Sequence, residues 1–267
     1  MIRDITIGQY YSAESLVHKL DPRVKLAATM LYIISLFAAD GPVCYLLAIA
    51  ELAAAIRLSS VPFRFMARGL KSVAVIMLIT VSFNLFLTPG TSILDVWLLR
   101  NITWQGIEKA IYMGVRLFLL ILGSSLLTLT TTPNALTDGL EKSLGFLKKV
   151  HVPIHEISMM MSIALRFIPI LIEETDKIMK AQMARGADFE TGGLIRKAKA
   201  MVPLLVPLFI SAFRRASDLA MAMEARCYHG DVNRTKMKPL VYHDLDKKTY
   251  LVLFGYLIVM IVIAVLW

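Results

Sequence analysis

The sequence predicts an all-α integral membrane protein with about five transmembrane helices and a separate domain of two long, bent amphipathic helices and a shorter one. Of its 267 residues, 57% are hydrophobic and 18% are charged, and the mean hydropathy is +0.64. Soluble domains average about 45 to 50% apolar and about 25% charged residues, so one soluble core of this size would not bury the apolar excess. The two cysteines, Cys44 and Cys227, exclude a disulfide-built fold.

Three charge-free segments are long enough to cross a bilayer, which takes roughly 20 helical residues. They are Ser72–Leu94, Leu117–Thr137 and Thr249–Trp267. Two shorter apolar segments, Leu26–Ala39 and Gly41–Ile56, adjoin across a turn that contains Asp40 and Pro42. They predict a tight hairpin of two modest spans, with a re-entrant or interfacial hairpin as the alternative.

Basic residues near the ends of the spans predict the orientation, because Lys and Arg favour cytoplasmic loops. They gather in the N-terminal segment and between the second and third spans: Arg3, Lys19, Arg23, Arg57, Arg64, Arg68 and Lys71. We therefore expect residues 1–23 to be a cytoplasmic segment without a signal peptide and 24–132 to hold transmembrane helices 1–4. Residues 133–248 would form a cytoplasmic domain, and the fifth helix, 249–267, would end on the extracellular side.

Two amphipathic helical patterns dominate the predicted cytoplasmic domain, one over residues 156–185 and one over 194–226. We interpret them as helices outside the membrane, and a shorter helix is expected over 133–149. Proline inside a helix bends it, and three prolines lie in the two long patterns: Pro169, Pro203 and Pro207.

The two long helices are expected to end alike, each with an arginine just before a break. The first ends on Arg185 followed by Gly186, which suits a left-handed C-terminal cap. The second ends on Arg226 followed by Cys227, which suits it poorly, so Gly230 is a candidate for the exit. A cation at a helix C-terminus is favoured by the macrodipole alone. Two such ends on a pair of amphipathic helices also suggest docking into acidic or carbonyl-lined grooves of a partner.

Three features together resemble the T component of energy-coupling factor (ECF) importers, the EcfT/CbiQ family, over nearly the whole chain. They are the segment Leu20–Leu26, the triplet Ala184-Arg185-Gly186, and Ala222–Tyr228 followed by Arg234-Thr235. The resemblance implies a scaffold in a bacterial cell membrane that joins a substrate-binding membrane S component to two cytoplasmic ABC-type ATPases, A and A′, for uptake of vitamins or related micronutrients. Residues 133–248 would then be a cytoplasmic coupling domain. The S component could be one of several interchangeable ones.

The resemblance also implies two sets of contact residues. ATPase docking would involve Ala184, Arg185, Gly186, Ala225, Arg226 and Cys227, the last standing where the family usually has glycine. The S component would contact an apolar surface that includes Met159, Met160, Met161, Ile163, Phe167, Leu204, Leu205, Leu208 and Phe209. No cofactor or metal is expected on this chain, and ATP-Mg would bind to the partner ATPases.

Other functions have weaker sequence support. No Gly-x-x-x-x-Gly-Lys-Ser/Thr phosphate loop occurs, so the chain is not expected to be the ATPase. A membrane-embedded enzyme acting on a lipid-linked or acidic substrate is the alternative, with candidate groups at separate helix ends: Asp138, His151, Asp188 and His229. Nucleic-acid binding is not expected, because residues 134–248 mix 13 acidic with 18 basic residues.

Two further patterns offer candidate chemistry. His151 and His155 have the spacing of a metal pair, but Pro153 interrupts them and no further ligand cluster is evident. Glu51 and Arg116 within apolar segments suggest either an ion path or, as we prefer, side chains that lie near an interface or are paired within the bundle.

Overall fold

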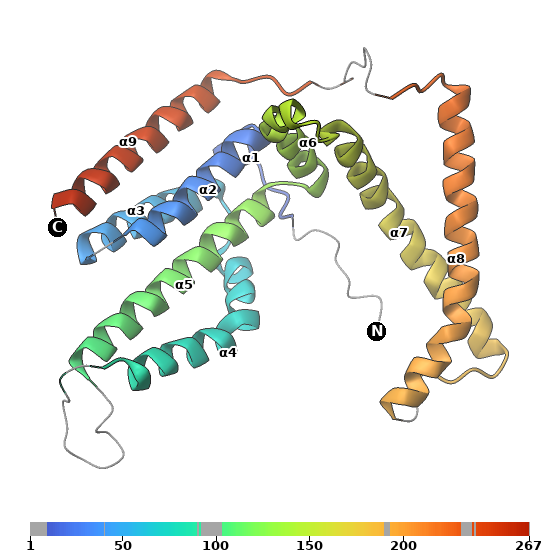
Figure 1. The fold of residues 1–267 in the computed structure, drawn as a ribbon, viewed down its shortest axis with the longest axis horizontal. Helices are drawn as coiled ribbons and strands as arrows, with labels where there is room; N and C mark the ends of the chain where they lie inside the picture. The colour runs from blue at the N-terminus through green and yellow to red at the C-terminus, as the bar shows by residue number, and fades with distance from the viewer. Residues whose placement is uncertain are drawn as a thin grey trace. The chain divides into compact units, whose positions relative to one another are not determined.

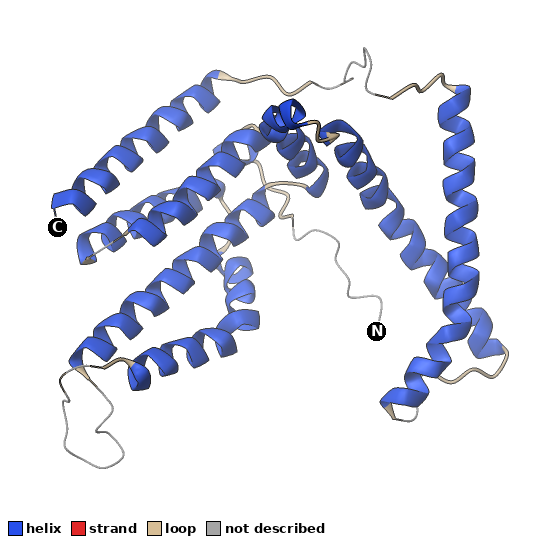
Figure 2. Ribbon diagram, in the orientation of Figure 1, coloured by secondary structure: helices blue, strands red, loops and turns tan. Residues whose placement is uncertain are grey.

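The computed structural model describes residues 10–39, 41–89, 91, 103–189, 193–230, 237 and 239–266, and every regular element in them is a helix (Figures 1 and 2). This confirms the all-α prediction. The elements in chain order are α1 Leu16–Lys19, α2 Pro22–Ala38, α3 Pro42–Ser59, α4 Phe63–Leu87, α5 Trp104–Thr130, α6 Pro133–Ser143, the 3₁₀-helix η1 Leu144–Val150, α7 Ile154–Ala184, α8 Leu194–Ala225 and α9 Asp244–Leu266. Several residues of the sequence argument lie outside the described ones: Arg3, Asp40, residues 92–94, Arg234, Thr235 and Trp267.

The chain divides into two compact units. The first, called the bundle unit below, comprises residues 8–142 and 240–267 and so contains α1 to α6 and α9. The second, called the arm unit, comprises residues 143–239 and contains η1, α7 and α8. The predicted limits of the membrane and cytoplasmic parts concern a bilayer, which this division does not test, and they stay predictions.

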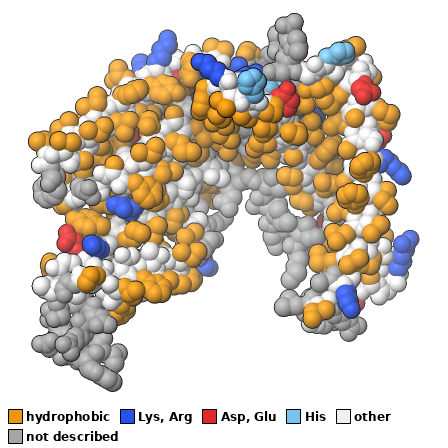
Figure 3. Space-filling view, in the orientation of Figure 1, with side chains coloured by type: hydrophobic (Ala, Val, Ile, Leu, Met, Phe, Trp, Pro, Cys, Tyr) orange, Lys and Arg blue, Asp and Glu red, His pale blue; other side chains and the backbone are white. Residues whose placement is uncertain are grey.

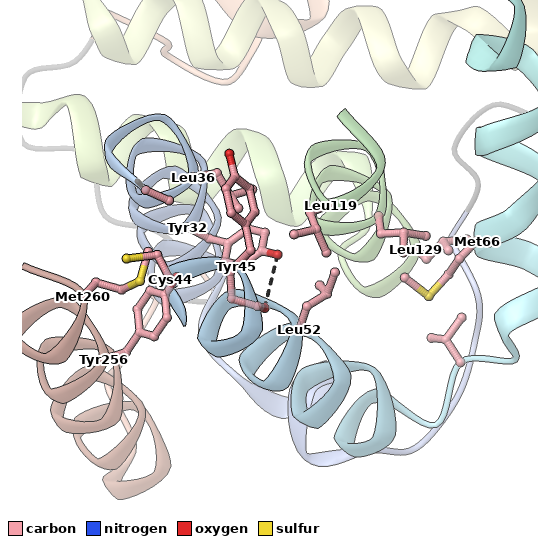
Figure 4. Close-up of a cluster of buried hydrophobic side chains, with 14 residues drawn as sticks. Tyr32, Leu36, Cys44, Tyr45, Leu52, Met66, Leu119, Leu129, Tyr256 and Met260 are labelled. Atoms are coloured by element: carbon pink, nitrogen blue, oxygen red, sulfur yellow. Dashed lines mark hydrogen bonds between the residues drawn. The ribbon is translucent and has the colours of Figure 1, made fainter. Parts of the chain in front are cut away.

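A buried apolar cluster holds the bundle unit together, with side chains from α2, α3, α4, α5 and α9 (Figure 4). Leu36, Cys44 and Met66 are completely buried. Several polar side chains inside the bundle pair with one another or with the backbone, as hydrocarbon favours. The Tyr32 hydroxyl donates to the Ala48 carbonyl at 3.4 Å, and Ser35 Oγ and the Tyr256 hydroxyl share a hydrogen bond of 2.8 Å that joins α2 to α9.

Four helices are long and apolar enough to cross a membrane: α3, α5, α7 and α9. The two parts of α4, which meet at 62° between Lys71 and Val73, make a fifth if they form one span. This agrees with the predicted number of about five, although the set differs. The helix α7, which we predicted as an amphipathic helix outside the membrane, meets the length and hydropathy requirement, whereas α2 has 17 residues and is shorter.

The helices that contain two of the charge-free segments have different bounds from those segments. The helix α5 begins at Trp104, well before Leu117, because a helix that starts with a Thr103 cap (Thr103 Oγ1 accepts from the Gly106 N–H at 3.0 Å) tolerates charged residues in its early turns. It ends at Thr130, ahead of Pro133, where α6 starts. Likewise α4 begins at Phe63 rather than Ser72, so its first turns are basic.

The prediction of a single helix over 133–149 was wrong in its second half. The α-helix α6 stops at Ser143, and residues 144–150 form the 3₁₀-helix η1. Gly145 lowers the helical propensity there, and short 3₁₀ segments are common at helix ends. His151, with φ of 62°, then ends the segment.

The arm unit is built around the contact of α7 with α8 (Figure 1). The bounds of both helices match the predicted 156–185 and 194–226 to within two residues. Each helix runs through its internal prolines without interruption, Pro169 in α7 and Pro203 and Pro207 in α8. An ion pair joins the helices, between Arg215 Nη2 and Glu174 Oε2 at 3.0 Å.

Candidate functional site: two matched helix ends

The end of α7 forms a complete C-terminal cap. Arg185 is the capping residue, and Gly186 follows in the left-handed conformation with φ of 87°. The Gly186 N–H donates to the Met183 carbonyl at 2.9 Å, and the Ala187 N–H donates to the Gln182 carbonyl at 3.0 Å. These two bonds define the Schellman motif, which satisfies carbonyls that the helix itself leaves free.

The end of α8 has the same cap, although Cys227 stands in the position of the glycine. Arg226 is the capping residue, and Cys227 adopts the left-handed conformation with φ of 55°. The Cys227 N–H donates to the Glu224 carbonyl at 2.9 Å, and the Tyr228 N–H donates to the Met223 carbonyl at 3.0 Å. The expectation that Gly230 takes over the exit was therefore wrong: Cys227 makes the turn itself.

Both arginines are exposed at these ends, as are the residues on either side of them: Ala184, Gly186, Ala225 and Cys227. Within the part of the chain that the structure describes, neither the Arg185 nor the Arg226 guanidinium has an ion pair or side-chain hydrogen bond. A planar group with five donors and no partner within the described chain is suited to bind carboxylate or carbonyl oxygens on another protein.

The ion pair between α7 and α8 lies at the same distance from both ends. Glu174 lies about three helical turns before Arg185, and Arg215 lies equally far before Arg226 along the sequence. At a rise of about 1.5 Å per residue, each end is about 16 Å along its helix from the pair. The two arginines are thus carried on arms of equal length, measured from one contact.

An exposed apolar stripe runs along α8 on the N-terminal side of that contact. Its residues recur at steps of one and three, which places them on one side of a helix: Met201, Val202, Leu205, Val206, Phe209, Ile210 and Phe213, all more than half exposed. The rings of Phe209 and Phe213 stack with their centroids 6.3 Å apart. In Figure 3 hydrophobic side chains are prominent on α8. We call this set the α8 stripe.

The nine residues predicted to contact an S component differ in exposure. Four are exposed, namely Met160, Met161, Leu205 and Phe209, and four are half-buried, namely Met159, Ile163, Phe167 and Leu208. Leu204 is 5% exposed, so it packs inward and offers little surface. The sequence reading missed Val202, Val206 and Ile210, which the step of four residues from Val202 would have identified.

The segment around Asp21 has a structural role in the bundle unit. The Asp21 carboxylate caps α2 by accepting from the Arg23 N–H at 2.8 Å, with Pro22 in the first turn. It also pairs with the Arg23 guanidinium at 2.8 Å. Burial raises the pKa of Asp21, but the hydrogen bonds and charge of Arg23 outweigh it and hold that pKa below its usual value.

A second aspartate, missed by the sequence reading, ties this segment to α9. Asp246 is 1% exposed, and its carboxylate accepts from the backbone N–H of Asp21 at 2.9 Å and of His243 at 2.7 Å. It therefore serves the starts of α2 and α9 together. Its position in the first turn of α9, where acidic residues are favoured, was the available signal.

The remaining candidates form no recognisable reactive centre among the described residues. No cluster of three or more His, Cys, Asp or Glu side chains able to hold a metal occurs in that part of the chain. Arg116 Nε donates to the Tyr45 hydroxyl at 3.0 Å, which agrees with a side chain paired within the bundle. Glu51 has one buried carboxylate oxygen without a hydrogen-bond partner in the described part of the chain.

Comparison with known proteins relates the chain to transporter membrane proteins. The family described as Cobalt transport protein matches residues 13–237. The energy-coupling factor transporter transmembrane protein EcfT of Clostridium kluyveri is 52% identical over 247 residues, which cover 92% of both chains. The protein of the same name from Thermosediminibacter oceani is 50% identical, and the match covers 94% of both chains. The one from Bacillus subtilis is 47% identical, and the match covers 92% of this chain and 93% of the relative. The chain therefore belongs to the EcfT/CbiQ family of transporter transmembrane proteins.

Proposed function

We propose that the chain is the non-catalytic transmembrane coupling subunit of an ECF-type ABC importer in a bacterial cell membrane. Family membership supports the transporter role, and the names of the relatives describe an energy-coupling factor transporter. The observation that carries the coupling role is the pair of matched helix ends, each with an exposed arginine on an arm of equal length. One chain thereby offers two equivalent contacts to two ATPases.

Arg185 would dock into a groove on one ATPase and Arg226 into the corresponding groove on the other. The residues before them, Ala184 and Ala225, are small and exposed, so a partner backbone can approach closely. The Schellman caps hold the backbone of each arginine in a fixed conformation, because they bond two carbonyls of the last turn that would otherwise be free. Closure of the ATPases on binding ATP-Mg would therefore move the arms rather than unwind their ends.

The contact between α7 and α8 would carry this movement toward an S component. The α8 stripe, together with exposed Met160 and Met161 of α7, supplies an apolar surface for it. Methionine side chains re-pack readily against different surfaces, which would suit a subunit shared among several S components. Competition of two purified S components for one ATPase-loaded subunit tests this, and simultaneous binding of both would contradict it.

The docking proposal is tested by the double variant Arg185→Ala, Arg226→Ala in the complete complex. We expect the variant to insert and to keep its S component, to lose both ATPases on co-purification and to abolish uptake. Lys180→Ala with Arg214→Ala, which removes two exposed cations from the same two helices, serves as the control. Retention of both ATPases and full uptake by the arginine double variant would refute the assignment.

A further inference from the structure

An apolar cavity of about 340 Å³ lies inside the bundle unit. Its walls come from α1, α2, α3, α5 and α9, and most of the residues that line it are Leu, Val or Ala. Ligand pockets range from about 300 to 1,000 Å³, so the volume suits a ligand chain. Cavities lined by apolar groups do not hold water stably, and a compact polar ligand would find few partners here.

The cavity opens toward the end of the bundle where α2 and α9 begin and where α3 and α5 end. Its lining includes exposed residues that mark the mouth, Leu16, Leu58 and Val252. Lys248, also on the lining, is exposed. In the orientation of the proposed function, on which this inference rests, that end faces the cytoplasm.

The charged groups of the described lining are two lysines and one glutamate. Lys25 is buried, and its ammonium donates to the carbonyls of His18 at 3.1 Å and Thr130 at 2.9 Å. An ammonium has three donors, so one remains. Glu51 is the acidic group, and its Oε2 atom is buried without a hydrogen-bond partner in the described part of the chain. Two basic groups and one acidic group therefore line the cavity, and the rest of its wall is mostly apolar.

We infer that this cavity binds an anionic phospholipid of the cytoplasmic leaflet, with an acyl chain among α2, α3 and α9 and the phosphate at Lys248. Burial of each methylene of an acyl chain favours binding, so the acyl chain supplies the affinity. Basic pockets between transmembrane helices on the cytoplasmic side bind anionic head groups, so Lys248 supplies the selection between anionic and zwitterionic lipids.

The test uses the complete complex, washed in detergent and analysed for retained lipid by native mass spectrometry. Vesicles containing equal phosphatidylglycerol and phosphatidylcholine supply the lipids. We expect wild type to retain phosphatidylglycerol selectively, and inorganic phosphate not to displace it. Lys248→Glu should lower retention by about fivefold or more, since one basic residue near an anionic surface contributes about that factor.

Two matched variants separate the site from general effects. Lys247→Glu makes the same charge change at the neighbouring residue, which pairs with Asp244 and does not line the cavity. Ala54→Phe fills the cavity, whereas Ala53→Phe places the same ring on an exposed position of α3 outside the lining. Lipid should be lost in Lys248→Glu and Ala54→Phe and kept in the other two. Equal retention within either pair, or equal retention of both lipids by wild type, would overturn the inference.

Wild type alone gives a second measurement that needs no variant to fold. A phosphatidylglycerol with a photoreactive acyl chain should cross-link to residues of the lining such as Leu58 or Leu253. Labelling spread evenly over α4 positions such as Val75, or displacement of the probe by a partner's peptide, would overturn the inference. All four variants should still co-purify both ATPases, so failure of lipid binding is distinguished from failure of the proposed function.

Discussion

The ends of α7 and α8 share one backbone geometry and differ in the residue that makes the turn. Gly186 and Cys227 occupy the same position of the cap, with φ of 87° and 55°. The two hydrogen bonds that define the motif measure 2.9 Å and 3.0 Å at each end. The geometry is therefore set by the bonding of the last turn, and glycine lowers its cost without being required.

The middles of the same helices differ in charge. When the two sequences are aligned on their terminal arginines, Glu174 of α7 corresponds to Arg215 of α8 and Lys177 corresponds to Asp218. Glu174 and Arg215 form the ion pair. Opposite charges at matching positions favour contact of one helix with the other over contact of either with its own copy. The two helices therefore share the geometry of their C-terminal ends and carry opposite charges at their point of contact, which suits them to act as a pair.

Removing one arginine at a time breaks the equivalence of the ends most strongly. Truncating one partner of a buried, hydrogen-bonded charge contact costs about 2 to 5 kcal/mol. We expect Arg185→Ala and Arg226→Ala each to weaken the docking of one ATPase by a similar amount, measured as the dissociation constant for that ATPase. Lys180→Ala is the control. A large effect of one variant and none of the other would show that the shared geometry does not produce shared function.

Placing valine at the turn tests the caps directly. A β-branched residue is strained in the left-handed region, and such strain costs about 1 to 3 kcal/mol. We expect Gly186→Val to destabilise its helix end more than Cys227→Val does, because Cys227 already bears part of the strain of the left-handed conformation. Hydrogen exchange of the amides of residues 187 and 228 measures the opening of each end. Equal protection in wild type and Gly186→Val would contradict the assigned cap.

The ion pair between the arms is expected to contribute less. Its side chains are 39% and 24% exposed for Arg215 and Glu174, and partly exposed pairs contribute about 0.2 to 1 kcal/mol. Glu174→Gln and Arg215→Gln should each lower thermal stability slightly, and the double variant should lose less stability than the sum of the two single losses. The charge exchange Glu174→Arg with Arg215→Glu should restore most of the lost stability, with Glu173→Gln as the neighbouring control. Strict additivity would show that the two side chains do not interact.

Much of this arrangement could be predicted from the sequence because it depends on local patterns. Apolar runs predicted the approximate number of spans, and helical periodicity predicted the bounds of α7 and α8 to within two residues. The charge-free segment Leu117–Thr137 did not match the bounds of the α5 helix, since a helix can begin among charged residues that lie near an interface. Asp246 escaped notice because its partner, the Asp21 backbone, is far away in the sequence. Contacts of that kind follow from packing rather than from any pattern along the chain.

The smallest effect should come from making the two ends identical. Cys227→Gly removes the side-chain strain of the left-handed conformation, about 1 kcal/mol, but adds backbone freedom to the unfolded chain, which offsets roughly 0.5 to 1 kcal/mol. The balance is expected to leave stability within about 0.5 kcal/mol of wild type by the same two estimates. Transport and ATPase docking should not change, because the Cys227 backbone already has the left-handed conformation that glycine favours. A marked loss of uptake would show instead that the Cys227 side chain, exposed beside Arg226, contacts the ATPase.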